Sequence, residues 1–100
     1  MAKKITPSTG NVFEDLGFPK EEAENLRVRS ALMATIRGIL EEEGLTQARA
    51  AKLFGVSQPR VSDLVRGKIE LFSIDALVNM VAASGRHVHI SIGTPRGESA

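Results

Sequence analysis

The side chains best suited to chemistry gather in one stretch of the sequence, residues 45–68, which reads LTQARAAKLFGVSQPRVSDLVRGK. If the second half of this stretch is a helix, its apolar positions leave Gln58, Arg60, Ser62 and Asp63 for solvent or a ligand. A glutamine amide can form two hydrogen bonds with adenine, and a carboxylate can accept one from cytosine N4. Side chains of these types are therefore able to bond base edges, if the ligand is DNA.

The basic residues are concentrated in the same stretch. Residues 1–45 hold six Lys/Arg and eight Asp/Glu, residues 46–68 hold five and one, and residues 69–100 hold two and three. The three parts have net charges of −2, +4 and −1, although the whole chain has only +1. A basic patch on this element favours contacts with phosphates, the alternative being a solvated face. Trp and Tyr are absent, so base stacking explains little.

Catalytic and metal-binding chemistry find little support in the sequence. There is no cysteine and no glycine-rich phosphate loop. His87 and His89 share one face of an expected strand, but no third ligand is visible and zinc sites usually need three or four. The three carboxylates of residues 41–43 are expected to be a solvated helix end. We therefore expect neither an enzyme nor a bound metal or cofactor.

Two short helices joined by a tight turn are expected to position the polar side chains. Thr46 can cap a first helix from Gln47 to about Phe54, and Gly55 suits the left-handed turn after it. Ser57 can cap a second helix that runs to about Arg66. That second helix is expected to bury three apolar residues: Val61, Leu64 and Val65.

Two further helices are expected around this pair. One runs from Lys20 to about Glu43 with a broad apolar stripe, and the other starts after the N-cap Ser73 and ends before Gly85. The buried stripe of the second is expected to be Ile74, Leu77, Val78 and Val81. The pattern predicts a mostly α fold in which residues 19–85 form a helical DNA-binding domain.

The segment before this domain, residues 1–18, is expected to be flexible. Met1–Gly10 is polar and reads as a tail. Residues 11–18, NVFEDLGF, are too apolar for an ordinary tail and can form one helical turn or an extended strap. They either pack on their own domain or bind in a groove of a partner protein.

Residues 86–92, RHVHISI, change from a helical to a strand period, with Val88, Ile90 and Ile92 on one face. A lone strand leaves its backbone groups without partners. The economical solution is antiparallel pairing with the same segment of a second copy about a two-fold axis. Pairing back onto Val12 and Phe13 is the alternative. Residues 93–100 are expected to be a tail.

The length and the apolar pattern further limit which classes of protein the sequence can represent. One hundred residues make about one small domain, for which oligomerisation is a common source of added stability. The sequence begins without a signal-like pattern and contains no long apolar run, so we expect a cytoplasmic protein.

The stretch from Leu45 to Lys68 closely resembles the helix-turn-helix of the XRE (Cro/C1-like, phage-repressor) family, through its Thr-Gln opening, its central Gly55 and its Leu64–Gly67–Lys68 ending. The resemblance implies that the second helix lies in the major groove of DNA. Carried over by position, the residues facing bases are Gln58, Pro59, Arg60, Ser62 and Asp63. Those at the DNA backbone are Thr46, Gln47, Arg49, Lys52, Ser57, Arg66 and Lys68.

Over residues 11–92 the sequence also resembles the HigA-type antitoxins of that family. This wider resemblance implies a homodimer that binds a palindromic operator, represses its own operon and neutralises a RelE/HigB-like ribonuclease toxin. The toxin would contact the apolar residues near the beginning of the chain: Val12, Phe13, Leu16 and Phe18.

Two other functions stay open at this point. A stand-alone phage or host regulator would need no partner for residues 11–18, and a neighbouring small toxin gene would separate it from an antitoxin. A protein-interaction module that no longer binds DNA is the alternative of another class. The net charge of +4 on residues 46–68 argues against that module.

Overall fold

The computed structural model describes residues 11–93, which are mostly helical and contain no strand. Within these residues, five α-helices and one 3-10 turn follow each other in the order α1 (Val12–Asp15), α2 (Lys20–Glu42), α3 (Gln47–Phe54), α4 (Gln58–Val65), η1 (Ile69–Leu71) and α5 (Ile74–Ala83). The helices expected from the sequence are confirmed within one or two residues, while η1 was not predicted.

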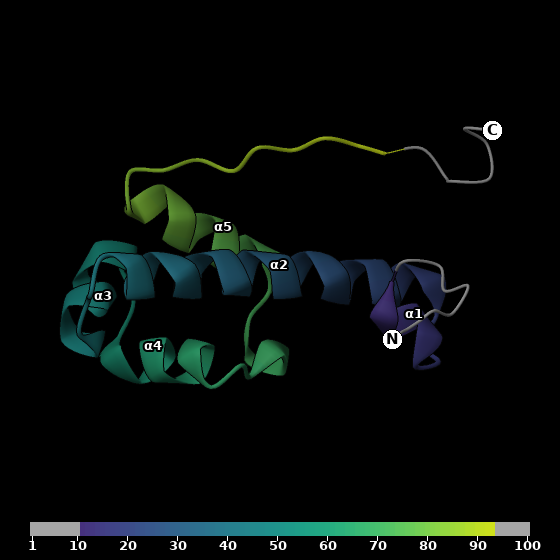
Figure 1. Ribbon diagram of the computed structural model, residues 1–100, viewed down its shortest axis with the longest axis horizontal. Coiled ribbons are helices and arrows are strands. Elements are labelled where there is room, and N and C mark those ends of the chain that lie inside the picture. The colour runs from purple at the N-terminus through teal and green to yellow at the C-terminus, as the bar shows by residue number, and fades with distance from the viewer. Residues whose placement is uncertain (1–10, 94–100) are drawn as a thin grey trace.

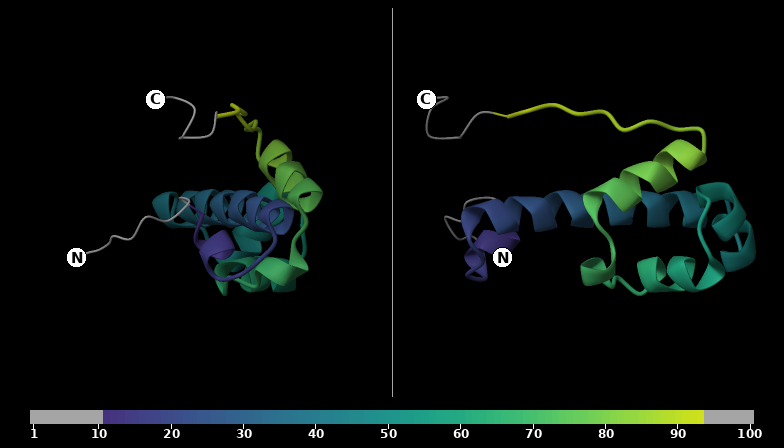
Figure 2. Two further views of the ribbon diagram at one scale, coloured as in Figure 1. Left: turned by 90° about the vertical axis from the view of Figure 1, so that its right-hand side faces the viewer. Right: turned by 180° about the vertical axis from the view of Figure 1, so that it is seen from behind.

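Helix α2 is the long axis around which the other elements are arranged (Figure 1). Helix α1 lies against its beginning, and α3 lies at its far end. Helices α4 and α5 pack along the half of α2 that is nearer α3, on different sides of it (Figure 2). The helix-turn-helix pair is therefore held by both α2 and α5.

Side-chain caps fix where the shorter helices begin. Thr46, Ser57 and Ser73 each accept a hydrogen bond from the backbone N–H three residues on, as the sequence predicts. Gly55 ends α3 at φ 70°, a left-handed conformation that glycine adopts without a Cβ clash. Asn11 caps α1 through its side-chain oxygen, which accepts from the N–H groups of Phe13 and Glu14.

One apolar core lies where α2, α3, α4 and α5 meet. Its largest fully buried side chains are Ile36, Phe54, Val61, Leu64, Phe72 and Leu77. Five of the six come from the helices, whereas Phe72 follows η1 and enters the core from the connection between α4 and α5. That connection is consequently a packed part of the domain.

Two residues of the expected buried stripes are in fact exposed. Val65 and Val78 are each 37% exposed, whereas the residues directly before them, Leu64 and Leu77, are 1% and 0% exposed. Consecutive residues of an α-helix point about 100° apart, and in these two helices the following valine lies at the edge of the buried face. The prediction that Val65 and Val78 are buried was therefore wrong.

The chain after α5 is extended and runs back over α5 in the direction of the beginning of α2 (Figure 1). Residues 86–92 carry no strand in the described part of the chain. Val12–Asp15 is helical, so the alternative in which this segment pairs as a strand with Val12 and Phe13 is wrong. Pairing with a second copy stays a prediction.

Residues 11–18 fold as the short helix α1 followed by a turn, and α1 packs against α2. The rings of Phe13 and Phe18 meet edge to face, with 6.3 Å between their centroids. Val12 and Leu16 remain 61% and 70% exposed. Of the tails expected at 1–10 and 93–100, all but Gly93 lies outside the described residues. No helix in the described part of the chain is long and apolar enough to span a membrane.

Candidate nucleic-acid interface

The turn between α3 and α4 brings the first turns of the two helices together. The N–H of Val56 donates to the carbonyl of Ala51 over 3.0 Å, which closes the end of α3 around Gly55. Ala50 is fully buried, and such a small side chain lets a second helix cross closely. As a result Gln47, Gln58, Pro59 and Ser62 line one shallow surface hollow.

This hollow contains three of the five residues expected to face bases. Gln58 and Pro59 are exposed, and Ser62 is half-buried. Gln47, expected at the DNA backbone, completes the lining from α3. The hollow thus presents the amides of Gln47 and Gln58 and the hydroxyl of Ser62, which are the donors and acceptors that the grooves of DNA can pair with.

The basic side chains expected at the DNA backbone form two groups. Arg49, Lys52 and Arg66 are exposed, and none of them forms an ion pair within residues 11–93. Lys68 instead has its Nζ 3.8 Å from a carboxylate oxygen of Asp63. Such a partly exposed pair contributes little stability, but it offsets the charge of the one acidic residue on α4.

The two cap hydroxyls, Thr46 and Ser57, are exposed and already engaged. Thr46 Oγ1 accepts from the N–H of Arg49 over 3.1 Å, and Ser57 Oγ accepts from the N–H of Arg60 over 3.3 Å. A hydroxyl that accepts in this way keeps its own proton to donate. Both can cap their helices and still donate to a phosphate.

Arg60 lies differently from the other residues expected to face bases. Its Nη1 donates to the carbonyl of Leu71 over 3.0 Å, and its guanidinium carbon lies 4.3 Å from the centre of the Phe72 ring. The side chain is half-buried against η1. The sequence did not reveal this contact, because η1 was not predicted and a helical pattern does not show which side a loop will cover.

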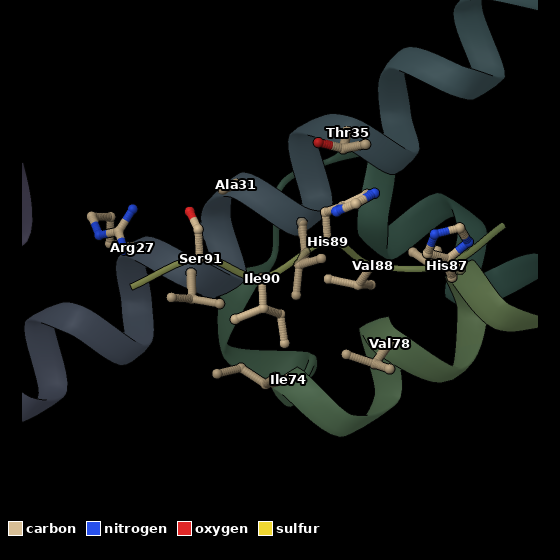
Figure 3. Close-up of a pocket in the computed structure, with 13 residues that line it drawn as sticks. Arg27, Ala31, Thr35, Ile74, Val78, His87, Val88, His89, Ile90 and Ser91 are labelled. Atoms are coloured by element: carbon tan, nitrogen blue, oxygen red, sulfur yellow. The ribbon is translucent and has the colours of Figure 1, made fainter. Parts of the chain in front are cut away.

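A second surface feature lies on the other side of the molecule. An apolar hollow is bounded by α2, α5 and the extended residues 87–91, where Val88 and Ile90 lie beside Val78 and Ile74 (Figure 3). Val88 is half-buried, while Ile90 and Ile92 are 78% and 89% exposed. The expected dimerisation residues therefore present apolar surface next to an apolar depression.

His87 and His89 flank Val88 in the same segment. Their ring centroids are 5.3 Å apart. Within the described residues no group of three or more His, Cys, Asp or Glu side chains is arranged to hold a metal ion.

Comparison with known proteins agrees with this geometry. The sequence pattern of a family described as a helix-turn-helix domain matches residues 12–93. A solved structure of a proposed XRE-family transcriptional regulator is similar over 79% of this chain and 90% of its own, with a TM-score of 0.68 and 32% identity. No curated protein matches. The chain therefore belongs to the helix-turn-helix family, and it is a DNA-binding transcriptional regulator of the XRE type.

Proposed function

We propose that this protein is a sequence-specific repressor that binds a palindromic operator as a homodimer and acts as the antitoxin of a toxin–antitoxin pair. The observation that carries the DNA-binding half is the shallow hollow lined by Gln47, Gln58, Pro59 and Ser62. The same helix-turn-helix stretch carries exposed basic side chains that form no ion pair within residues 11–93: Arg49, Lys52 and Arg66. The hollow supplies groups for base edges, and the cations supply attraction to phosphates.

The contacts follow from this arrangement. Gln58 and Ser62 bond base edges in the major groove, and Pro59 packs against them. Arg49, Lys52 and Arg66 contact phosphates, helped by Thr46, Gln47 and Ser57. Lys68 pairs with Asp63 in the free chain, and its ammonium group keeps further N–H donors for a phosphate. A base contact by Asp63 is the remaining part of the expected set.

The dimer is formed through the extended segment after α5. Its three apolar residues alternate with polar ones, and Ile90 and Ile92 are largely exposed in the single chain. Antiparallel pairing about a two-fold axis would satisfy the backbone groups of residues 86–92 and cover these side chains. Two recognition helices then enter successive major grooves, and the half-sites lie one helical turn, or a multiple of it, apart.

The antitoxin part of the proposal rests on α1. Val12, Leu16 and Phe18 are exposed although they are apolar, and with Phe13 they occupy a short segment beside the beginning of α2. Several exposed apolar side chains within one short segment are a common feature of protein-binding sites. We take its partner to be a RelE/HigB-like toxin; an XRE regulator that works without a toxin is the second candidate.

A fluorescence-anisotropy titration tests the DNA-binding half. The purified chain is titrated against DNA from its own promoter and against random DNA, at two salt concentrations. We expect tighter binding to the promoter that weakens as salt increases. Equal affinity for both DNAs would contradict a sequence-specific repressor.

Co-purification tests the antitoxin half. The tagged chain is co-expressed with the product of a small neighbouring gene, and Leu16→Asp is compared with the wild type. We expect the wild type to retain that product and the variant to release it while binding promoter DNA as before. If the wild type retains nothing, the chain is a stand-alone regulator.

A further inference from the structure

Two arginines from different helices converge on the connection between α4 and α5. Arg29 of α2 donates through Nη1 to the carbonyls of Ile69 (3.2 Å) and Phe72 (3.3 Å), and its Nε donates to Asn25 over 2.7 Å. Arg60 of α4 donates to the carbonyl of Leu71, which lies between those two. Three carbonyls within four residues are thus held by guanidinium groups.

The aromatic ring at the end of this connection is the fixed point of the cluster. Phe72 is 1% exposed and belongs to the core formed by α2, α3, α4 and α5. The guanidinium of Arg60 lies 4.3 Å from the centre of that ring, a distance at which a cation is attracted to the face of an aromatic group. Arg60 therefore ties the first turn of α4 to a buried residue of the core.

Helix geometry separates Arg60 from the residues of the shallow hollow. Gln58 and Ser62 are four residues apart and lie about 40° apart around the helix axis, on one face. Arg60 is two residues from each and points about 160° away from both, toward η1. In this fold its side chain is directed away from the hollow that Gln58 and Ser62 share with Gln47.

We infer that Arg60 is a positioning residue, which sets the orientation of α4 in the major groove through Leu71 and Phe72 and contacts neither a base nor a phosphate. This inference rests on the proposed DNA-binding function. An arginine suits the role because its planar guanidinium can stack on a ring and donate sideways at the same time. A change at Arg60 would then tilt Gln58 and Ser62 together.

The test compares Arg60→Met with Arg49→Met. Arg49 is also an arginine of the helix-turn-helix, but it is exposed and forms no ion pair in the described part of the chain. Affinities are measured against the operator, against a set of operators with one base pair changed, and over a range of salt. Circular dichroism at the assay temperature confirms that each variant is folded.

We expect Arg60→Met to weaken operator binding about tenfold with the salt slope of the wild type. Because Gln58 and Ser62 tilt together, the loss should be smaller for every operator variant in which a base pair read by either residue is already changed. Arg49→Met should instead lower the salt slope by about one unit, as the loss of a phosphate contact does. A loss confined to one base pair, a lower salt slope, or unchanged affinity for Arg60→Met would each overturn the inference.

Amide hydrogen exchange of the free protein tests the positioning role of Arg60 without DNA. Arg60→Met should accelerate amide exchange in α4 and η1, whereas Arg49→Met should not; equal exchange in the two variants would overturn it. If wild-type protein does not select its promoter, the proposed function fails, and the exchange result still decides the role of Arg60. Arg60→Lys replaces Arg60→Met if the methionine variant is partly unfolded, since it keeps the charge but not the planar guanidinium.

Discussion

Replacing Ile90 by alanine should separate the proposed dimer into monomers. The side chain is 78% exposed in the single chain, so most of its surface is free to be covered by a second copy. The change removes three carbons, each worth about 0.8 kcal/mol when buried, or about 2.4 kcal/mol in total. Scaling by the exposed fraction gives about 1.9 kcal/mol for each copy and about 4 kcal/mol for a two-fold dimer. The dimer dissociation constant should rise about a thousandfold.

Sedimentation equilibrium over a range of protein concentrations measures that constant. Leu16→Ala is the matched control, because it also removes three carbons from a largely exposed side chain (70%), but on α1 and in an assay without toxin. We expect the control to dimerise like the wild type. Ile90→Ala with an unchanged dissociation constant, or a wild type that is monomeric at every concentration, would refute pairing through residues 86–92.

Three shorter predictions concern base reading, capping and titration. Gln58→Ala should lower the preference for one A·T pair of the operator by about 1–3 kcal/mol without changing thermal stability, and competition titrations with single-base variants measure this. Thr46→Ala removes the cap of α3 and should lower the free energy of unfolding by about 1 kcal/mol in denaturant titrations; an unchanged value would mean that the cap is not formed. The hydrogen bond from Arg27 and the attraction of its charge hold the pKa of Glu24 below its ordinary value. This exposed pair therefore stabilises the fold at a pH above the pKa that Glu24 has in the unfolded chain. The stabilisation is lost as the pH falls through the lower pKa that Glu24 has in the folded chain. An NMR titration should show the pKa of Glu24 returning toward its ordinary value in Arg27→Met.

The helix-turn-helix could be predicted from sequence because its signals are local. Thr46, Gly55 and Ser57 each act on backbone groups within five residues of themselves. Asn11, followed three residues later by Glu14, is a similar local signal for the start of a helix. This signal identifies α1 at a place where apolar composition alone allows either a helical turn or an extended strap.

The role of Arg60 could not be predicted, because its partners are eleven and twelve residues away in η1 and after it. Periodicity separates the buried face of a helix from its polar face. It does not show which residues of the polar face are covered by another segment of the chain. The same limit explains Val65 and Val78, whose exposure depends on the angle at which α4 and α5 meet their neighbours.

The length of α2 has a consequence for how binding events combine. Its 23 residues span about 35 Å, with α1 at one end and α3 at the other (Figure 1). A protein held by α1 and a DNA held by α3 and α4 would occupy separate ends of one rod. We therefore expect the partner protein and the DNA to bind the same chain at the same time. Because they do not compete for one surface, the relative amounts of partner protein and DNA determine which complex forms. Native mass spectrometry would show such a ternary complex, and mutual displacement of the two ligands would contradict this expectation.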